Sequence, residues 1–221
     1  MRHLVRQVRD ARHGIVYCRR GLGVPKALAL TFDDGPSEWT APILDACARA
    51  DARATFFVLG SSIAGNEETL RRAVAEGHEL GNHTWSHMDP ATLSDGELSG
   101  ELQRTTAAIL DVTGVRPRVF RPPYAESDRR VASVARAAGL EPTVLRSIDP
   151  ADWREGERCT IVRHIVDRAV RGAIVCLHDG VSPLERAEGA VRDETVAAVA
   201  DLTVALTARG YRLVTVSELL A

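Results

Sequence analysis

From Lys26 onward, segments with the pattern of β-strands alternate with segments that have the pattern of amphipathic helices. A strand, a helix and a second strand in this order build a parallel sheet with helices outside it. Seven such units follow one another without a break in composition, which predicts one barrel-like α/β domain rather than two domains. The expected strands are Ala27–Phe32, Ala54–Leu59, Glu79–Asn82, Val115–Arg121, Pro142–Ile148, Gly172–Leu177 and Tyr211–Thr215. The expected helices are Thr40–Ala50, Glu67–Glu76, Ser94–Val112, Asp128–Ala138, Thr160–Val170 and Val191–Ala208.

The N-terminal segment differs from the rest of the chain in its charge. Residues 1–26 hold seven Lys and Arg against one acid, Asp10. Four apolar residues recur at helical spacing, namely Leu4, Val8, Ala11 and Ile15. We therefore expect a basic arm or helix over 1–25, followed by the domain at 26–221. The start lacks the apolar stretch of about 7–15 residues that marks a secretory signal, which predicts a cytoplasmic protein, or a secreted one whose leader has been removed.

The composition is that of an ordinary globular protein. With 221 residues, 45% of them hydrophobic and 26% charged, the chain can bury a full core. A net charge of −2 argues against a nucleic-acid partner, and no apolar run approaches membrane-spanning length. The cysteines lie far apart and form no CxxC pair, which argues against a thiolate zinc site and predicts reduced, structural thiols. They are Cys18, Cys47, Cys159 and Cys176.

Clusters of polar residues follow five of the expected strands. They read "DDGP", "NHTWSH", "RPPY", "DPADW" and "HDG", in chain order. In barrels of parallel strands the active site forms at the carboxyl ends of the strands, so the clusters are expected to meet on one face. The first cluster sets Asp33 beside Asp34. Because adjacent carboxylates repel each other, at least one of them needs a cation or a protonated state.

A metal site is the first chemistry that these clusters suggest. His83 and His87 are four residues apart, so one helical turn would direct both imidazoles the same way. With the carboxylate of Asp33 or Asp34 they would hold Zn²⁺ or a similar divalent ion, Co²⁺ included, with positions left for water and substrate. The other aspartate could act as a base on the water, held by the guanidinium of Arg121.

The sixth strand ends in a histidine that suits acid catalysis. His178 follows the apolar run "GAIVCL", where a titratable side chain is out of place unless it is used or satisfied. Beside a metal site it would protonate the leaving group, while an aspartate of "DPADW" fixes its tautomer and raises its pKa. Trp153 and Leu177 would wall a small apolar pocket.

These clusters, in this order, resemble the motifs of the polysaccharide deacetylases of the NodB-homology type, carbohydrate esterase family four. "TFDDGP", "HTWSH", "RPPY", "DPADW" and "LHDG" are similar to the five motifs of that family, and the resemblance extends over about residues 26–221. It implies a distorted (β/α)7-type barrel that removes N-acetyl groups from amino sugars and releases acetate. The substrate would be an N-acetylated carbohydrate.

The resemblance also implies a role for each matching residue. Asp33 would be the base, Arg121 would orient it, and His178 would be the acid, tuned by Asp152 or, less favoured, by Asp149. The implied metal ligands are Asp34, His83 and His87. The implied substrate-binding residues are Tyr124, whose backbone amide would stabilise the oxyanion, together with Trp153 and Leu177.

The chain departs from the family pattern at one motif, and two other functions stay open. The family usually continues "RPPY" with glycine, where this chain has Ala125. If that position needs a positive φ, alanine would strain the loop. The same site would also fit an O-acetyl ester or a non-sugar amide, and a non-catalytic sugar-binding protein is the third reading. The missing secretory signal favours a soluble N-acetylated substrate inside the cell. The sugar, the length of its chain and the oligomeric state are left open.

Overall fold

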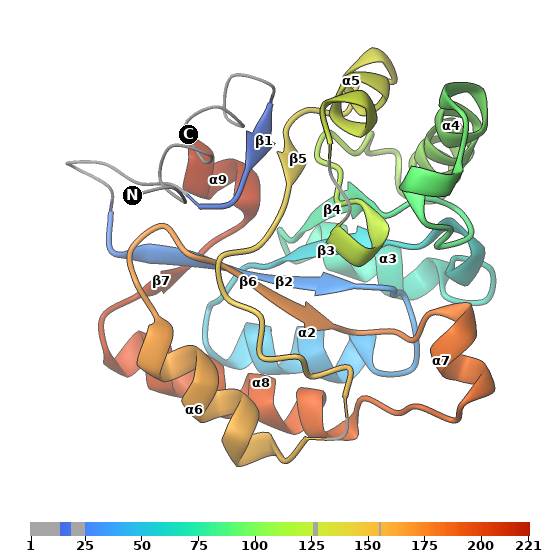
Figure 1. Cartoon of the computed structure of the whole chain (residues 1–221). Helices are drawn as coiled ribbons and strands as arrows, with labels where there is room; N and C mark the ends of the chain where they lie inside the picture. Colours follow the sequence, from blue (N-terminus) through green and yellow to red (C-terminus); the bar gives the residue numbers. More distant parts are fainter. Residues whose placement is uncertain (1–13, 19–24, 126–127, 155) are drawn as a thin grey trace.

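Parallel strands form the centre of the protein, with helices packed around them (Figure 1). The structure is a computed structural model that describes residues 14–18, 25–125, 128–154 and 156–221. Its strands are β1 (Ile15–Val16), β2 (Ala27–Asp33), β3 (Thr55–Val58), β4 (Glu79–Asn82), β5 (Thr143–Val144), β6 (Ile174–His178) and β7 (Arg212–Leu213). The order β4-β3-β2-β6 makes the main sheet, β7 also pairs with β2, and β1 pairs with β5.

Strand β2 lies at the centre of this arrangement. All seven of its residues, "ALALTFD", are buried, because β3 and β6 flank it and both of its faces are covered. Such strands read as continuous apolar runs rather than as alternating ones. Asp33, the last residue of β2, and Asp34, which follows it, are therefore held by buried backbone that is paired on both sides.

Single bridges complete the ring that the regular ladders begin. Phe120 pairs in parallel with Asn82 of β4 and with Thr143 of β5, and Ile148 pairs with Val175 of β6. The path β2, β3, β4, Phe120, β5, Ile148, β6 thus returns to β2. One half of this ring is a regular sheet and the other half is held by isolated bridges, so the predicted distorted α/β barrel is confirmed.

The helices cover the outside of the strands. They are α2 (Thr40–Arg49), α3 (Glu67–Ala75), α4 (Asp95–Thr113), α5 (Arg129–Ala137), α6 (Arg158–Arg168), α7 (Pro183–Ala187), α8 (Asp193–Ala208) and α9 (Val216–Leu220). Helices α2, α6 and α8 lie on one side of the β2–β6 pair, and α4 and α5 lie on the other (Figure 1). Local signals set the ends: Ser94 and Glu97 form a capping box at the start of α4, and Gly114, with φ of 72°, ends it. Short 3₁₀ turns occupy Gly60–Ser62, Pro90–Thr92 and Pro123–Ala125.

Most predicted elements are present, although the expected strands Pro142–Ile148 and Tyr211–Thr215 shorten to the two-residue strands β5 and β7. The expected strand Val115–Arg121 is reduced to the bridges of Phe120, because Pro117 has no N–H to donate to a ladder. Ile15, expected on the N-terminal helix, lies in strand β1, while residues 1–13 lie outside the described part of the chain.

Two short helices, α7 and α9, were not expected. Each has only five residues, too few for a periodic apolar pattern, although each starts with a capping box. Among the described residues, no helix is both long enough and apolar enough to cross a membrane.

Candidate active site

Two adjacent carboxylates mark the carboxyl end of β2. Asp33 is the last residue of the strand, and Asp34 follows it with a left-handed φ of 73°; both are buried. The turn after β6 packs directly under this point, because a Cβ on Gly180 would overlap the carbonyl oxygen of Asp34 and the nitrogen of Gly35. Only glycine fits there. The ends of β2 and β6 are therefore in backbone contact.

Arg121 holds the first carboxylate. Its Nη1 donates to Asp33 Oδ1 at 2.8 Å and to Thr31 Oγ1 at 2.6 Å. Its Nε and Nη2 donate to the carbonyls of Val144 at 3.3 Å and Leu145 at 3.2 Å, so the buried guanidinium is fixed on every side. Burial by itself would raise the pKa of Asp33, but Arg121 and then two nearby histidines outweigh it and hold the pKa below its usual value. Asp33 is kept ionised.

The second carboxylate faces two imidazoles in a geometry that suits a metal ion. Asp34 Oδ1 lies 3.4 Å from His83 Nε2 and 3.2 Å from His87 Nε2, yet this buried oxygen accepts no hydrogen bond from the described residues. Ligands about 2.1 Å from a tetrahedral Zn²⁺ are separated by roughly 3.4 Å. The Nδ1–H of His83 donates to the Arg121 carbonyl at 2.7 Å, which leaves the Nε2 lone pair for a ligand bond. The buried oxygen without a hydrogen bond and these two spacings fit a divalent metal.

The histidines reach this point by another route than a helical turn. Both follow β4 in a loop, in which Thr84 has φ of 69° and His87 has φ of 59°. The helical turn expected from their four-residue spacing was therefore wrong, although the two side chains converge. Left-handed backbone at non-glycine residues costs free energy, and such strain gathers at functional sites.

His178 is paired with Asp152. Its Nδ1–H donates to Asp152 Oδ1 at 2.8 Å, and the other carboxylate oxygen accepts from the His178 N–H and from Thr195 Oγ1, each at 2.9 Å. Burial would lower the pKa of His178, but Asp152 raises it to about 9. Asp149, the alternative partner, forms an ion pair with Arg146 at 2.6 Å instead and does not contact His178.

These residues surround one open cavity of about 920 Å³. Tyr124 lines it, with its ring centre 4.8 Å from that of His87, and Trp153 lies at its edge. Tyr124 and Ala125 both have left-handed backbones, with φ of 57° and 56°. The position at which the family usually has glycine does adopt a positive φ here, so alanine is strained there.

Part of the rim of the cavity is apolar and exposed. Leu184 on α7 is 64% exposed and Val191 is 60% exposed, and both line the cavity with the half-exposed Tyr124 and Trp153. These rim residues lie on loops or on the short helix α7, not on the strands. The rim offers apolar surface for a substrate to cover.

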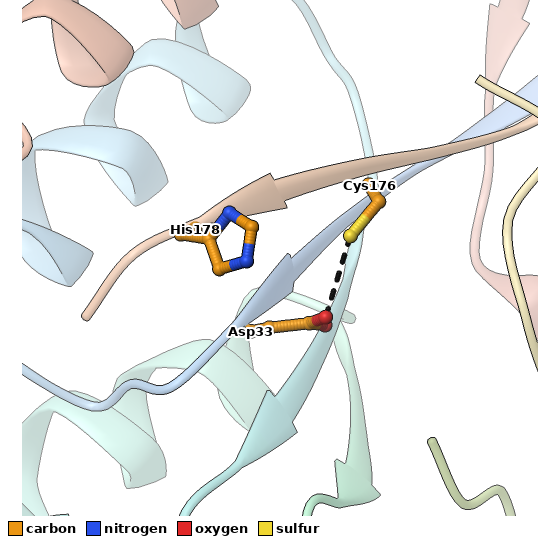
Figure 2. Close-up of side chains that lie close together, drawn as sticks. All are labelled: Asp33, Cys176 and His178. Atoms are coloured by element: carbon orange, nitrogen blue, oxygen red, sulfur yellow. Dashed lines mark hydrogen bonds between the residues drawn. The ribbon is translucent and has the colours of Figure 1, made fainter. Parts of the chain in front are cut away.

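Leu177 does not line the cavity, and Cys176 does. Leu177 is fully buried in the core on the opposite face of β6, because side chains alternate along a strand. Cys176 shares the face of His178, and its Sγ lies 3.3 Å from Asp33 Oδ2 (Figure 2). Leu177 is therefore absent from the cavity wall, where its expected substrate-binding role would require it, and alternation back from His178 places Cys176 there instead.

The sequence profile described as "Polysaccharide deacetylase" matches residues 22–143, more than half of the chain. The chain belongs to the polysaccharide deacetylase family. It is 36% identical over 202 residues to the peptidoglycan-N-acetylglucosamine deacetylase PgdA of Listeria monocytogenes, which covers 89% of this chain and 40% of the relative. It is 37% identical to the chitooligosaccharide deacetylase of Bradyrhizobium sp., over 85% of this chain and 88% of the relative.

Solved structures agree with the fold. The peptidoglycan deacetylase PdaC from Bacillus subtilis superposes with a TM-score of 0.78 at 36% identity, over 88% of this chain and 89% of that chain. The chain spans 40% of the length of Listeria PgdA, so it corresponds to one part of that longer protein. The predicted family and barrel are confirmed. The residues of this chain that the structure describes include a group suited to a divalent metal, Asp34, His83 and His87.

Proposed function

We propose that this protein is a metal-dependent hydrolase that removes the N-acetyl group from an amino sugar and releases acetate. One observation carries the proposal: the adjacent Asp33 and Asp34 have different partners. Asp33 forms an ion pair with Arg121 and remains an ionised carboxylate outside the metal group, while Asp34 faces His83 and His87. A base and a metal ligand are thereby provided by neighbouring residues.

The proton transfers follow from the positions of two side chains. Asp33, ionised and held by Arg121, accepts a proton from the attacking water at its oxygen. His178, which the Asp152 carboxylate keeps protonated, donates a proton from Nε2 to the leaving amine. Because the Nδ1–H of His178 is committed to Asp152, Nε2 is the ring nitrogen left for the reaction.

The metal is expected to be Zn²⁺, with Co²⁺ as a substitute. Two imidazole nitrogens and one carboxylate oxygen form the donor set of many catalytic zinc sites and leave coordination positions open. A divalent ion held there supplies a Lewis acid for the acetyl carbonyl and lowers the pKa of water. His83 is oriented for this role by its bond to the Arg121 carbonyl.

The cavity supports a sugar of more than one ring as the substrate. Its volume of about 920 Å³ lies in the upper part of the range for small-molecule sites, roughly 300–1,000 Å³. Tyr124 and Trp153 line it with aromatic side chains, which suit an apolar sugar face.

Acetate release tests the proposal. Metal-stripped protein would be given N-acetylated chito-oligosaccharides and O-acetylated sugars, before and after addition of Zn²⁺ or Co²⁺. Release from the N-acetylated sugars only after metal addition supports the proposal, with Asp33→Asn as a control that binds metal and does not turn over. Acetate release from the O-acetylated sugars alone would reject the proposal and identify the protein as an esterase.

A further inference from the structure

A second group of possible metal ligands lies in the same cavity, beside the one already described. Asp33, Cys176 and His178 each offer one ligand atom, and these atoms lie within 4.8 Å of one another. Figure 2 shows the three side chains together at the ends of the adjacent strands β2 and β6. We propose that Asp33, Cys176 and His178 form a second, thiolate-containing site for a zinc-like divalent cation, and that filling it blocks the active site.

The spacing of the ligand atoms carries the first step. A tetrahedral zinc with bonds of about 2.3 Å to sulfur and about 2.1 Å to oxygen separates these two atoms by roughly 3.6 Å. Cys176 Sγ and Asp33 Oδ2 are 3.3 Å apart in the structure. The carboxylate oxygen is free for this use, because Arg121 binds the other oxygen, Oδ1. The third atom, on His178, lies within 4.8 Å of these two atoms and completes the group by moving closer to them.

The surroundings of His178 carry the second step. Metal-binding histidines commonly donate the other ring nitrogen to a carboxylate, which fixes the tautomer and strengthens the ligand. Asp152 accepts from His178 Nδ1 in this way at 2.8 Å. The remaining nitrogen, Nε2, then carries the lone pair once its proton has left.

The ligand types set the class of metal. A thiolate, an imidazole and a carboxylate are the donors that Zn²⁺ and softer ions such as Cd²⁺ prefer, whereas Mg²⁺ and Ca²⁺ prefer oxygen alone. Arg121 already neutralises Asp33, so the thiolate and the Asp152 carboxylate beside His178 supply the two negative charges that balance the cation. Binding is balanced as one M²⁺ in and the Cys176 thiol proton out, with a second proton lost where His178 starts as the imidazolium.

The consequence for activity rests on the proposed function. A cation on Asp33 and His178 occupies both the base and the acid, so neither can transfer a proton. The first equivalent of zinc, at Asp34, His83 and His87, would then activate the protein. A second equivalent would inhibit it, whereas excess Mg²⁺ would not.

Cadmium titration of the metal-stripped protein tests the site without any substrate. We expect two bound equivalents, of which one brings the ultraviolet absorption of a cadmium–thiolate bond together with the release of protons. Cys176→Ser should bind one equivalent and lose the absorption band. Cys159→Ser, which removes an exposed thiol outside the cavity, should keep both. A band that persists in Cys176→Ser, or one bound equivalent in the wild-type protein, would overturn the proposal.

A second variant tests the imidazole as a ligand of the second site. His178→Ala keeps the thiol and removes the imidazole, so it should hold the first equivalent and bind the second more weakly than His164→Ala does.

Two cadmium equivalents in a protein that releases no acetate would uphold the second site and reject the proposed function. An active enzyme that excess zinc does not inhibit would reject the second site and uphold the function.

Discussion

Asp33 and His178 are register partners on the neighbouring parallel strands β2 and β6. Side chains at paired positions of parallel strands point to the same face of the sheet. A backbone bond from the Asp179 N–H to the Asp33 carbonyl, at 3.1 Å, continues the pairing by one residue beyond the strands. The base and acid candidates are thus set apart by the strand spacing itself, and their separation does not depend on a loop.

Removal of one histidine should remove the metal. His83→Ala deletes one of three ligands, and the loss should weaken metal affinity at least about 100-fold, since even indirect partners of ligands are worth 10–100-fold. Metal content after dialysis measures this. His164→Ala on α6, a partly buried histidine outside the cavity, serves as the matched control and should retain the metal. Equal metal content in the two variants would reject His83 as a ligand.

Removal of the acid should slow turnover and spare metal binding at the first site. General acid catalysis contributes about 10²–10⁴-fold, so His178→Ala should lower kcat by that factor. Steady-state kinetics at saturating substrate, with one equivalent of zinc, measure the change. A loss of only twofold would assign His178 a structural role.

The partner of His178 should set the alkaline limit of activity. Asp152 raises the pKa of His178 to about 9, so the imidazolium is available as an acid below that pH and is lost above it. Asp152→Asn removes the charge, and the alkaline limb of the rate profile should shift to lower pH. A folded-state pKa above the usual value of about 6.5 also stabilises the fold below that value, and this stability fades as pH rises toward 9. An unshifted limb would show that another group titrates there.

The strained loop should tolerate glycine. Left-handed backbone costs an L-residue about 1–2 kcal/mol, whereas glycine adopts it freely but adds flexibility to the unfolded chain. Ala125→Gly should therefore range from neutral to about 1 kcal/mol more stable. Ala107→Gly, at an exposed position of α4, should lose about 1 kcal/mol. Chemical denaturation compares the two, and equal losses would show that the Ala125 loop is not strained.

Much of the fold could be predicted from the sequence because apolar runs and helical periods are local signals. The run "ALALTF" predicts β2 without reference to any partner. The half of the barrel around Phe120 could not be predicted in this way, because isolated bridges depend on what the rest of the chain places beside them. Short helices such as α7 also escape, since five residues make little more than one turn.

The positions of site residues could be predicted from the sequence where they follow a strand directly, and less well where a loop sets their position. Asp34 follows β2 and the two histidines follow β4, and these strands run parallel in one sheet with β3 between them, so their carboxyl ends lie at the same edge. The preference for Asp152 over Asp149 came from the family resemblance, because the residues alone do not show that Arg146 holds Asp149.

The division between strand ends and rim has a consequence for how such proteins diversify. Asp33 and His178 end buried strands, whereas Leu184 and Val191 stand on exposed segments that carry little of the core. Loops accept insertions and substitutions that strands do not. Descendants of one ancestor could therefore exchange the polymer they recognise by altering a few surface segments, while inheriting the reaction unchanged.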